Sequence, residues 1–288
     1  MSSDVGTVAL ALSPRQADPP VVTSRNSLKR RTITALLLAP PAVLAVVLGP
    51  PWSDLLLLLM AAVMAWEWAH VCRSGRPLET PELALILGAT LALLLGMFLG
   101  VTGVVLGLVA GAVLLLVAWR LSLHRDALLA WLMGGLLYVV LPLWLLHWLR
   151  GDNVEGRDLV LWLLLVIWAV DSGAYAFGKT IGGPRLAPRW SPNKTWAGLL
   201  GGAFTSMLVG WVAALMFDME APGLMGLLGG ALAFVGQGGD LLESAIKRRF
   251  GLKDASNLIP GHGGVLDRVD GLIAAVMPVA VLVALGVL

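Results

Sequence analysis

Charged side chains are concentrated between residues 244 and 270 of a chain that is otherwise strongly apolar. The basic residues there include Lys247, Arg248, Lys253 and Arg268. They could hold phosphate, because arginine binds it bidentately and lysine binds it as a point charge. Long apolar runs flank this stretch on both sides. We therefore expect it at a membrane surface, where water, phosphate and metal ions can reach it.

The start of this region predicts a helix face that carries both signs of charge. Asp240, Glu243, Ser244 and Lys247 are spaced i, i+3, i+4 and i+7, so a continuing helix places them on one face. A face with two carboxylates beside a lysine is not expected to point at lipid.

Two more carboxylates could converge on this face. Asp267 and Asp270 share the i, i+3 spacing, and the Pro-Gly-His-Gly-Gly turn at residues 260–264 allows the backbone to fold back toward the preceding apolar run. The chain has one cysteine, Cys72, so a cysteine-based zinc site is excluded. Oxygen ligands suit a hard cation, and magnesium held by one or two carboxylates plus substrate phosphates fits best.

Ser191, Lys194 and Thr195 form a second candidate phosphate site. They stand at the start of an apolar run, and a helix N-terminus with free N–H groups, two hydroxyls and a lysine can bind an anion. A structural role is compatible with this one, with Ser191 as the helix N-cap and Pro192 at the first helical position.

His262 lies in the glycine-rich turn, where it could donate a hydrogen bond to phosphate, shuttle a proton or serve only the turn. A serine hydrolase built on Ser244 and His262 is a weaker interpretation, because nothing resembles a nucleophile elbow. A soluble-type nucleotide fold is not indicated.

The composition is that of an integral membrane protein. Of the 288 residues, 58% are hydrophobic and 13% are charged, against about 25% charged in an ordinary soluble domain. Residues 1–24 contain prolines and serines without apolar periodicity, and are predicted to be a flexible cytoplasmic tail. Residues 25–288 are predicted to be a single transmembrane catalytic domain, whose site is formed by residues 171–198 and 239–270.

The apolar runs predict an all-α, polytopic bundle of about nine transmembrane helices, since a spanning helix needs about 20 apolar residues. A glycine-rich turn near Gly100 and Gly103 separates the third run from the fourth. The runs cover residues 33–48, 54–69, 83–99, 101–119, 127–148, 159–177, 196–217, 224–240 and 272–288, each to within a few residues.

Ionisable residues lie near the inner ends of these runs: Glu67, Asp171, Asp240, Glu243 and Asp270. Such groups cost about 2.5–3.5 kcal/mol at the centre of a spanning helix, so they are functional candidates by default. The penalty is smaller at a membrane edge, and a snorkelling or capping role stays open for each of them.

The distribution of lysine and arginine over the polar segments indicates how the chain is oriented in the membrane. With the N-terminus inside, all but Arg150 and Arg157 of the 20 lysines and arginines fall on the tail or on inner segments. The charged segments of the second half then face the cytosol, where nucleotides are. The residues alone thus predict a cytosol-facing, metal-assisted site that handles phosphates at a membrane surface.

Several runs in the second half of the chain together match a family signature. The longest is SAIKRRFGLKDASNLIPGHGGVLDRVD at residues 244–270, and GDLLES, DSGAYAFGK and SPNKTWAG begin at residues 239, 171 and 191. With the WEW run at residues 66–68, they resemble the phosphatidate cytidylyltransferase (CDP-diacylglycerol synthase) family. The resemblance covers about the last 120 residues by motif and the first half mainly by topology. Ala197 departs from it, since many relatives carry a polar residue there.

This resemblance implies transfer of a cytidylyl group from CTP to phosphatidate, giving CDP-diacylglycerol and pyrophosphate for phospholipid biosynthesis. It also implies a requirement for Mg²⁺, with a second cation such as K⁺ as a further candidate. Carried onto this chain, it makes Asp240 and Asp267 the first candidate metal ligands, and Asp171 and Asp270 the next.

The same resemblance assigns the remaining site residues. The triphosphate or the lipid phosphate would be held by hydroxyl and basic side chains, and His262 and Arg268 would orient and neutralise the reactants rather than take a proton. The residues that would hold phosphate are Ser191, Lys194, Thr195, Ser244, Lys247, Arg248 and Lys253.

The expected partners are CTP, phosphatidate and membrane lipid, without nucleic acid, and a homodimer is compatible with the sequence. The expected location is a bacterial-type inner membrane, with the N-terminus and the site cytosolic and the C-terminus outside. Two alternatives stay open: a CTP-dependent polyprenol or lipid kinase and, less favoured, an anion transporter. A transporter usually binds its substrate near the membrane midplane, between the two structural repeats of its fold. The charged residues of this chain are instead predicted at the cytosolic ends of the apolar runs.

Overall fold

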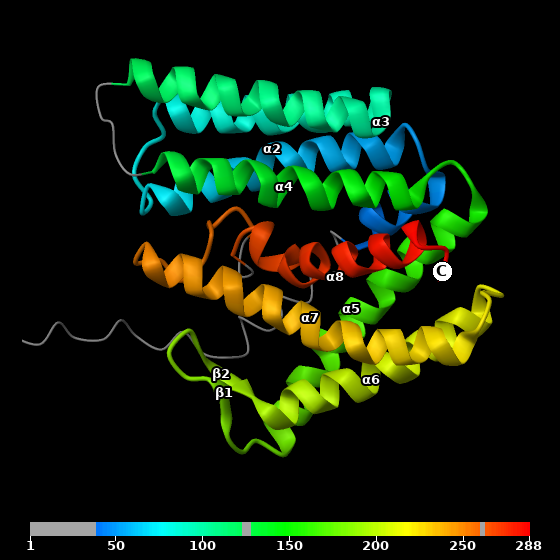
Figure 1. The fold of residues 1–288 in the computed structure, drawn as a ribbon. Helices are drawn as coiled ribbons and strands as arrows, with labels where there is room; N and C mark the ends of the chain where they lie inside the picture. The colour runs from blue at the N-terminus through cyan, green and yellow to red at the C-terminus, as the bar shows by residue number, and fades with distance from the viewer. Residues whose placement is uncertain (1–38, 123–127, 260–262) are drawn as a thin grey trace, which may run out of the picture.

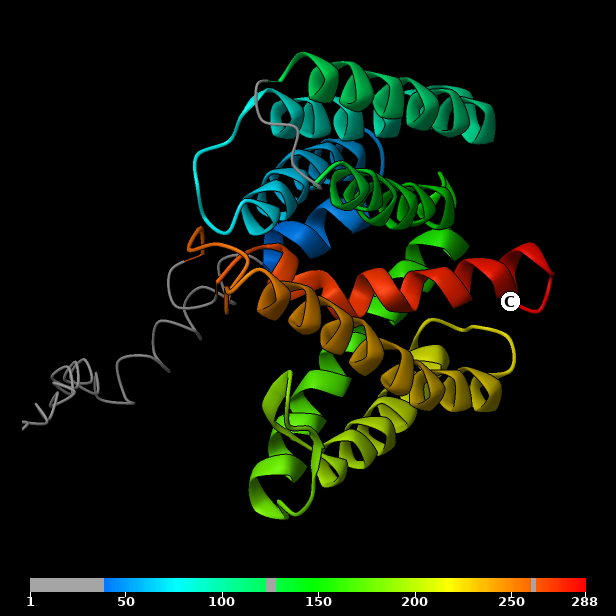
Figure 2. The same ribbon diagram turned by 60° about the vertical axis from the view of Figure 1, so that its left-hand side comes forward.

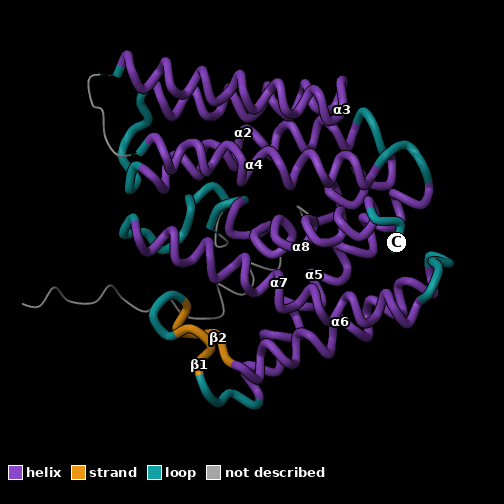
Figure 3. The backbone as a smooth tube through the Cα atoms, viewed as in Figure 1, coloured by secondary structure: helices purple, strands orange, loops and turns teal. Residues whose placement is uncertain are grey.

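The fold is a bundle of long helices with one small β-hairpin (Figures 1 and 3). The computed structural model describes residues 39–122, 128–259 and 263–288. A short helix, Ala39–Leu48, begins the described chain. It is followed by α2 (Trp52–Cys72), α3 (Thr80–Leu121), α4 (Leu129–Arg150), α5 (Val154–Thr180), β1 (Arg185–Ala187), β2 (Ser191–Thr195), α6 (Trp196–Met216), α7 (Pro222–Arg249) and α8 (Leu266–Ala284).

Helix α8 lies in the middle of the bundle, with α4 on one side and α7 on the other (Figures 1 and 2). Helices α2 and α3 lie beyond α4, whereas α5, α6 and the hairpin lie on the side of α7. The last helix of the chain therefore contacts elements from both of its halves.

Six described helices, α2 to α7, are long and apolar enough to cross a membrane. This confirms the prediction of a polytopic helical membrane protein. Helix α8 is not among these six helices, and its first turns contain three charged residues, Asp267, Arg268 and Asp270. The predicted tail and residues 33–38 of the first predicted span lie outside the described residues.

Helix α3 is interrupted at Gly100, where the backbone adopts φ +62° and ψ −142°. Only glycine adopts such a conformation readily. The two halves of α3 fold back on each other, since a Cβ atom built on Gly107 would lie 2.4 Å from the Cα atom of Ala92. The glycine-rich turn predicted between the third and fourth apolar runs is confirmed.

A small β-hairpin interrupts the otherwise α-helical fold and corrects one prediction. Arg185 pairs with Thr195 and Ala187 with Ser191 in a two-stranded antiparallel sheet. Ser191 is therefore not the N-cap of the next helix. That position belongs to Thr195, whose hydroxyl accepts a hydrogen bond from the Gly198 N–H at 3.1 Å. Pro192 lies in the strand, which a two-stranded sheet permits because both of its strands are edges.

Several helices extend beyond the apolar runs that predicted them. Helix α7 continues past Asp240 to Arg249, and α8 begins at Leu266 rather than near Leu272. Helix α5 begins at Val154, because the Asn153 side chain caps it by accepting from the Gly156 N–H at 2.8 Å. Apolarity marks the part of a helix that lipid or the core covers, and the polar helix ends lie outside it.

The close packing within α3 gives a first prediction. Gly107→Ala should lower the thermal unfolding midpoint by several degrees, because overpacking a tight contact costs about 1–3 kcal/mol. Gly134→Ala in α4 is the matched control, since a Cβ atom there meets nothing within 4 Å. Thermal unfolding of both variants in detergent compares them. Equal midpoints would contradict the packing described for α3.

Candidate active site

The charged face predicted at the end of α7 is present. Because α7 is continuous to Arg249, the hydroxyl of Ser244 lies 3.3 Å from Asp240 Oδ1, one turn away. Lys247 Nζ lies 3.0 Å from Glu243 Oε1 with the same spacing. One helix face therefore presents two acidic residues, a hydroxyl and a lysine.

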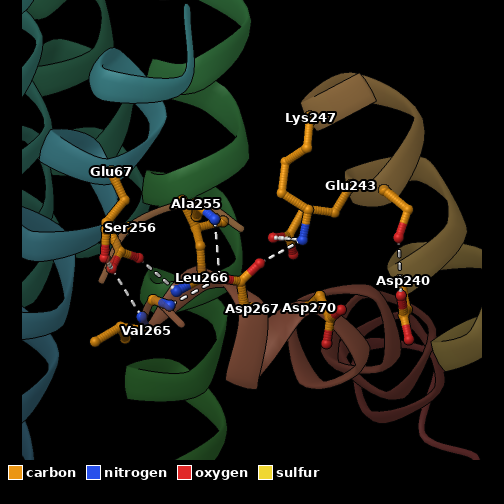
Figure 4. A network of polar contacts seen from close by, with 12 residues as sticks. Glu67, Asp240, Glu243, Lys247, Ala255, Ser256, Val265, Leu266, Asp267 and Asp270 are labelled. Atoms are coloured by element: carbon orange, nitrogen blue, oxygen red, sulfur yellow. Dashed lines mark hydrogen bonds and ion pairs between the residues drawn. The ribbon is translucent and has the colours of Figure 1, made fainter. Parts of the chain in front are cut away.

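Lys247 joins this face to helix α8. Its ammonium group forms a second ion pair, with Oδ1 of Asp267 (Figure 4). The side chains of all three partners, Glu243, Lys247 and Asp267, are less than a tenth exposed. A buried cation between two carboxylates keeps its charge and fixes the distance between the two helices.

Asp267 also holds the loop that connects α7 and α8. Its Oδ2 accepts hydrogen bonds from the Ala255 N–H at 2.9 Å and the Gly264 N–H at 2.7 Å. Both carboxylate oxygens are thus engaged by groups of the protein itself. The role of Asp267 as a metal ligand stays a prediction, and the contacts seen here show that its carboxylate also holds the loop and Lys247 in place.

Glu67 of α2 forms a second, fully buried anchor for the same loop (Figure 4). Its carboxylate accepts from the Ser256 hydroxyl at 2.6 Å, the Val265 N–H at 2.8 Å and the Leu266 N–H at 2.6 Å. The last two donors lie at the start of α8, where free N–H groups and the helix dipole favour an anion. Glu67 therefore fixes the position at which α8 begins.

The sequence did not assign this role to Glu67. The position of this carboxylate inside an apolar run indicated only that Glu67 was a candidate for a functional role. Its partners are 189 to 199 residues away in the chain, so no local spacing could have identified them. Gly264 leaves room for the Glu67 carboxylate, because a Cβ atom built on Gly264 would lie only 2.4 Å from Glu67 Oε1.

A further ion pair brings the hairpin to the charged face of α7. Lys194 of β2 pairs through Nζ with Oδ2 of Asp240, and their side chains are 18% and 31% exposed. The structure thus brings together a predicted phosphate-binding residue, Lys194, and a predicted metal ligand, Asp240. Thr195 is buried and caps α6, whereas Ser191 is half-buried at the other end of the strand.

Asp171 and Asp270 add negative charge near Asp240. Asp171 interacts electrostatically with Asp240, Lys194 and Arg268, and Asp270 interacts with Asp240 and Asp171. Helices α5, α7 and α8 therefore each direct an aspartate to one region. Within the described ranges, no three His, Cys, Asp or Glu side chains form a ready-made metal site. Oxygen donors of this kind fit Mg²⁺, which usually completes its shell with water and substrate phosphates.

The predicted phosphate-binding residues Arg248, Lys253 and Arg268 are exposed. In the part of the chain that the structure describes, none of the three forms an ion pair within 4.0 Å. They are therefore available to an anionic ligand, in contrast to the buried Lys247. His262 lies outside the described residues.

Comparison with known proteins gives consistent matches along the chain. A sequence model described as the cytidylyltransferase family matches residues 29–285. A phosphatidate cytidylyltransferase of Brucella suis biovar 1 is 36% identical over 256 residues, which are 87% of this chain and 91% of that protein. Proteins of the same name from Pseudomonas aeruginosa and Haemophilus influenzae are 37% and 34% identical, over 86% of this chain and 94% and 96% of their own lengths. The likeness thus extends well beyond the motif-bearing second half.

The contacts of Glu67 give a second prediction. Glu67→Gln should lower the thermal unfolding midpoint and increase protease cleavage in the loop between α7 and α8. An amide replaces one acceptor oxygen with a donor that faces a backbone N–H group, and an unsatisfied buried polar group costs about 1–3 kcal/mol. Thermal unfolding and limited proteolysis measure the two effects.

The exposed Glu220, between α6 and α7, provides the control for this substitution. Glu220→Gln removes the same charge without a buried contact and should leave both measurements unchanged. If Glu67→Gln behaved in the same way as Glu220→Gln, Glu67 would not be an anchor of α8.

Proposed function

This chain belongs to the cytidylyltransferase family, and from that premise we propose that it is a phosphatidate cytidylyltransferase. The enzyme transfers the cytidylyl group of CTP to phosphatidate, producing CDP-diacylglycerol and pyrophosphate. The observation that supports this proposal most is the likeness to proteins of that name at 34–37% identity over most of the chain. The cluster of acidic and basic side chains at the ends of α7 and α8 is suited to the same chemistry.

The reaction needs charge neutralisation more than it needs a base. A phosphate oxygen of phosphatidate attacks the α-phosphorus of CTP in line, and the bond from that phosphorus to the oxygen of the β-phosphate breaks. The attacking oxygen is already anionic, so no strong proton acceptor is required. Bringing two anions together and releasing pyrophosphate are the difficult steps, and fixed positive charge lowers both barriers.

Exposed basic side chains are the proposed phosphate ligands. Arg248, Lys253 and Arg268 are free of carboxylate partners within the described ranges, and Lys194 can exchange the Asp240 carboxylate for a phosphate oxygen. Ser191, Ser244 and His262 complete this set as hydrogen-bonding candidates. Which phosphate each of them contacts is left open.

Buried site residues have a different proposed role. Lys247 is enclosed by Glu243 and Asp267, and Thr195 caps α6. We assign both to positioning the exposed groups rather than to direct contact with substrate. Asp267 acts with Lys247 in the same way, since both of its oxygens are engaged.

Mg²⁺ is the proposed metal cofactor. Asp240, Asp171 and Asp270 are the side chains that would hold it, because they supply oxygen donors from three helices to one region. When bound, Mg²⁺ would supply positive charge that offsets the charge developing on the departing pyrophosphate. A second cation such as K⁺ remains a prediction from the family resemblance.

The proposed membrane topology has nine spans, with α3 counted as two and with α8 and the helix Ala39–Leu48 included. The N-terminus and the active site lie on the cytosolic side of a bacterial-type inner membrane, and the C-terminus lies outside. The distribution of lysine and arginine supports this orientation. A homodimer stays a prediction.

Labelled CTP tests the reaction directly. Purified protein incubated with phosphatidate and Mg²⁺ should transfer label from the α-phosphate of CTP to the lipid, and label from the γ-phosphate should appear in pyrophosphate. Transfer of the γ-label alone to the lipid would identify a CTP-dependent kinase instead. Transport of substrate by reconstituted protein without CTP turnover would exclude the enzyme.

Asp240→Asn tests the acidic cluster. Turnover should fall at least about 100-fold, the loss typical of removing one electrostatic contact to a transition state. Folding should be unaffected, because the pair with Lys194 is partly exposed and contributes little stability. Steady-state kinetics at varied Mg²⁺ and thermal unfolding measure the two effects.

Asp218→Asn is the control for this substitution. Asp218 lies between α6 and α7 and has φ +52°, a conformation that asparagine also tolerates. The control should retain full turnover. Near-normal turnover of Asp240→Asn would remove Asp240 from the catalytic site.

A further inference from the structure

A second charged cavity lies apart from the candidate active site. It has a volume of about 490 Å³ and lies between the end of α2, the start of α4 and the end of α7. Its lining includes Arg73, Arg76 and Arg249 together with Trp131 and Phe250. None of these residues was assigned to CTP or phosphatidate binding. The volume is in the range of small-molecule sites.

Among the described residues, three guanidinium groups line this cavity, and the carboxylates of Glu79 and Glu82 face one of them. Arg73 Nη2 is fixed by an ion pair with Glu79 Oε1 at 2.6 Å, and its Nε lies 4.0 Å from Glu82 Oε1. Arg76 and Arg249 are exposed, and no carboxylate of the described chain lies within 4.0 Å of either. Two guanidinium groups are therefore available beside a third that is held in place.

Aromatic rings position one of these free arginines. The Arg249 guanidinium lies over the Trp131 ring, 5.3 Å from its centroid. The Phe250 ring makes a T-shaped contact with Trp131, with the ring centroids 5.3 Å apart. Trp131 is fixed in turn, because its carbonyl accepts a hydrogen bond from Trp68 Nε1 at 2.8 Å. A stacked guanidinium loses less freedom when it binds, and it still offers its edge to an oxyanion.

We propose that this cavity is a second phosphate-binding site, which takes the headgroup of an anionic phospholipid. Arginine binds phosphate bidentately, and basic pockets between helix ends at a membrane face bind such headgroups. Trp131, Phe250 and Leu128 add an apolar wall of the kind that contacts the glycerol and upper acyl region of a lipid. A soluble phosphate compound shares the headgroup chemistry and is distinguished by competition.

Binding of short-chain phosphatidylglycerol to the detergent-purified full chain tests this site. This lipid is a phosphodiester and cannot replace phosphatidate as a substrate, so the measurement needs no CTP and no turnover. Arg249→Gln and Arg76→Gln should each weaken binding about tenfold, the factor that corresponds to 1.4 kcal/mol. Arg249→Lys should recover part of the affinity, because the charge remains while the bidentate geometry is lost.

Arg189→Gln is the matched control, since Arg189 is also exposed and does not line the cavity. It should leave phosphatidylglycerol binding unchanged, and short-chain phosphatidylcholine should bind poorly to the wild-type chain. Failure of inorganic phosphate to compete supports a lipid headgroup, and effective competition supports a soluble phosphate ligand in the same cavity. Wild-type affinity of both Arg249→Gln and Arg76→Gln, or weakening by Arg189→Gln alone, would overturn the proposal.

Discussion

The structure of the site depends on one buried cation. Lys247 lies between Glu243 and Asp267 with less than a tenth of its side chain exposed. Removing Lys247 would leave two buried carboxylates without their cation, and an uncompensated buried charge typically costs about 3–5 kcal/mol. The pair therefore holds the ends of α7 and α8 at a fixed separation. The contact of Lys247 with its two carboxylates therefore also positions the exposed charged side chains at the end of α7 and the start of α8.

Glu67 imposes a similar constraint from the other side of the loop. It holds the first N–H groups of α8, while Asp267 binds the N–H groups of Ala255 and Gly264. Three helices thus meet at one short connection through charge-assisted hydrogen bonds, which are stronger than neutral ones. The motif residues in this segment therefore include both the proposed site residues and the internal network of hydrogen bonds that holds them in place.

Sequence reasoning succeeded where a property was local. The i, i+4 relations of Asp240 with Ser244 and of Glu243 with Lys247 predicted the helix face, and Gly100 predicted the reversal within α3. It failed where a distant segment decided the outcome. Ser191 has the sequence of an N-cap, yet pairing with Ala187 places it in a strand. Asp267 stays a predicted metal ligand, and its contacts with Lys247 and the Ala255 N–H could not be predicted from local spacing.

A division between buried and exposed charge follows from the reaction itself. Groups that bind two polyanions and then release one must exchange partners in every turnover, so they need water and cannot be enclosed. Groups that set the geometry must not exchange partners, and a low dielectric strengthens their contacts. Lys247, Asp267 and Glu67 satisfy the second condition, while Arg248, Lys253 and Arg268 satisfy the first. The buried Lys247 and the exposed Arg248 are adjacent on α7, so the end of this helix supplies both environments within one turn.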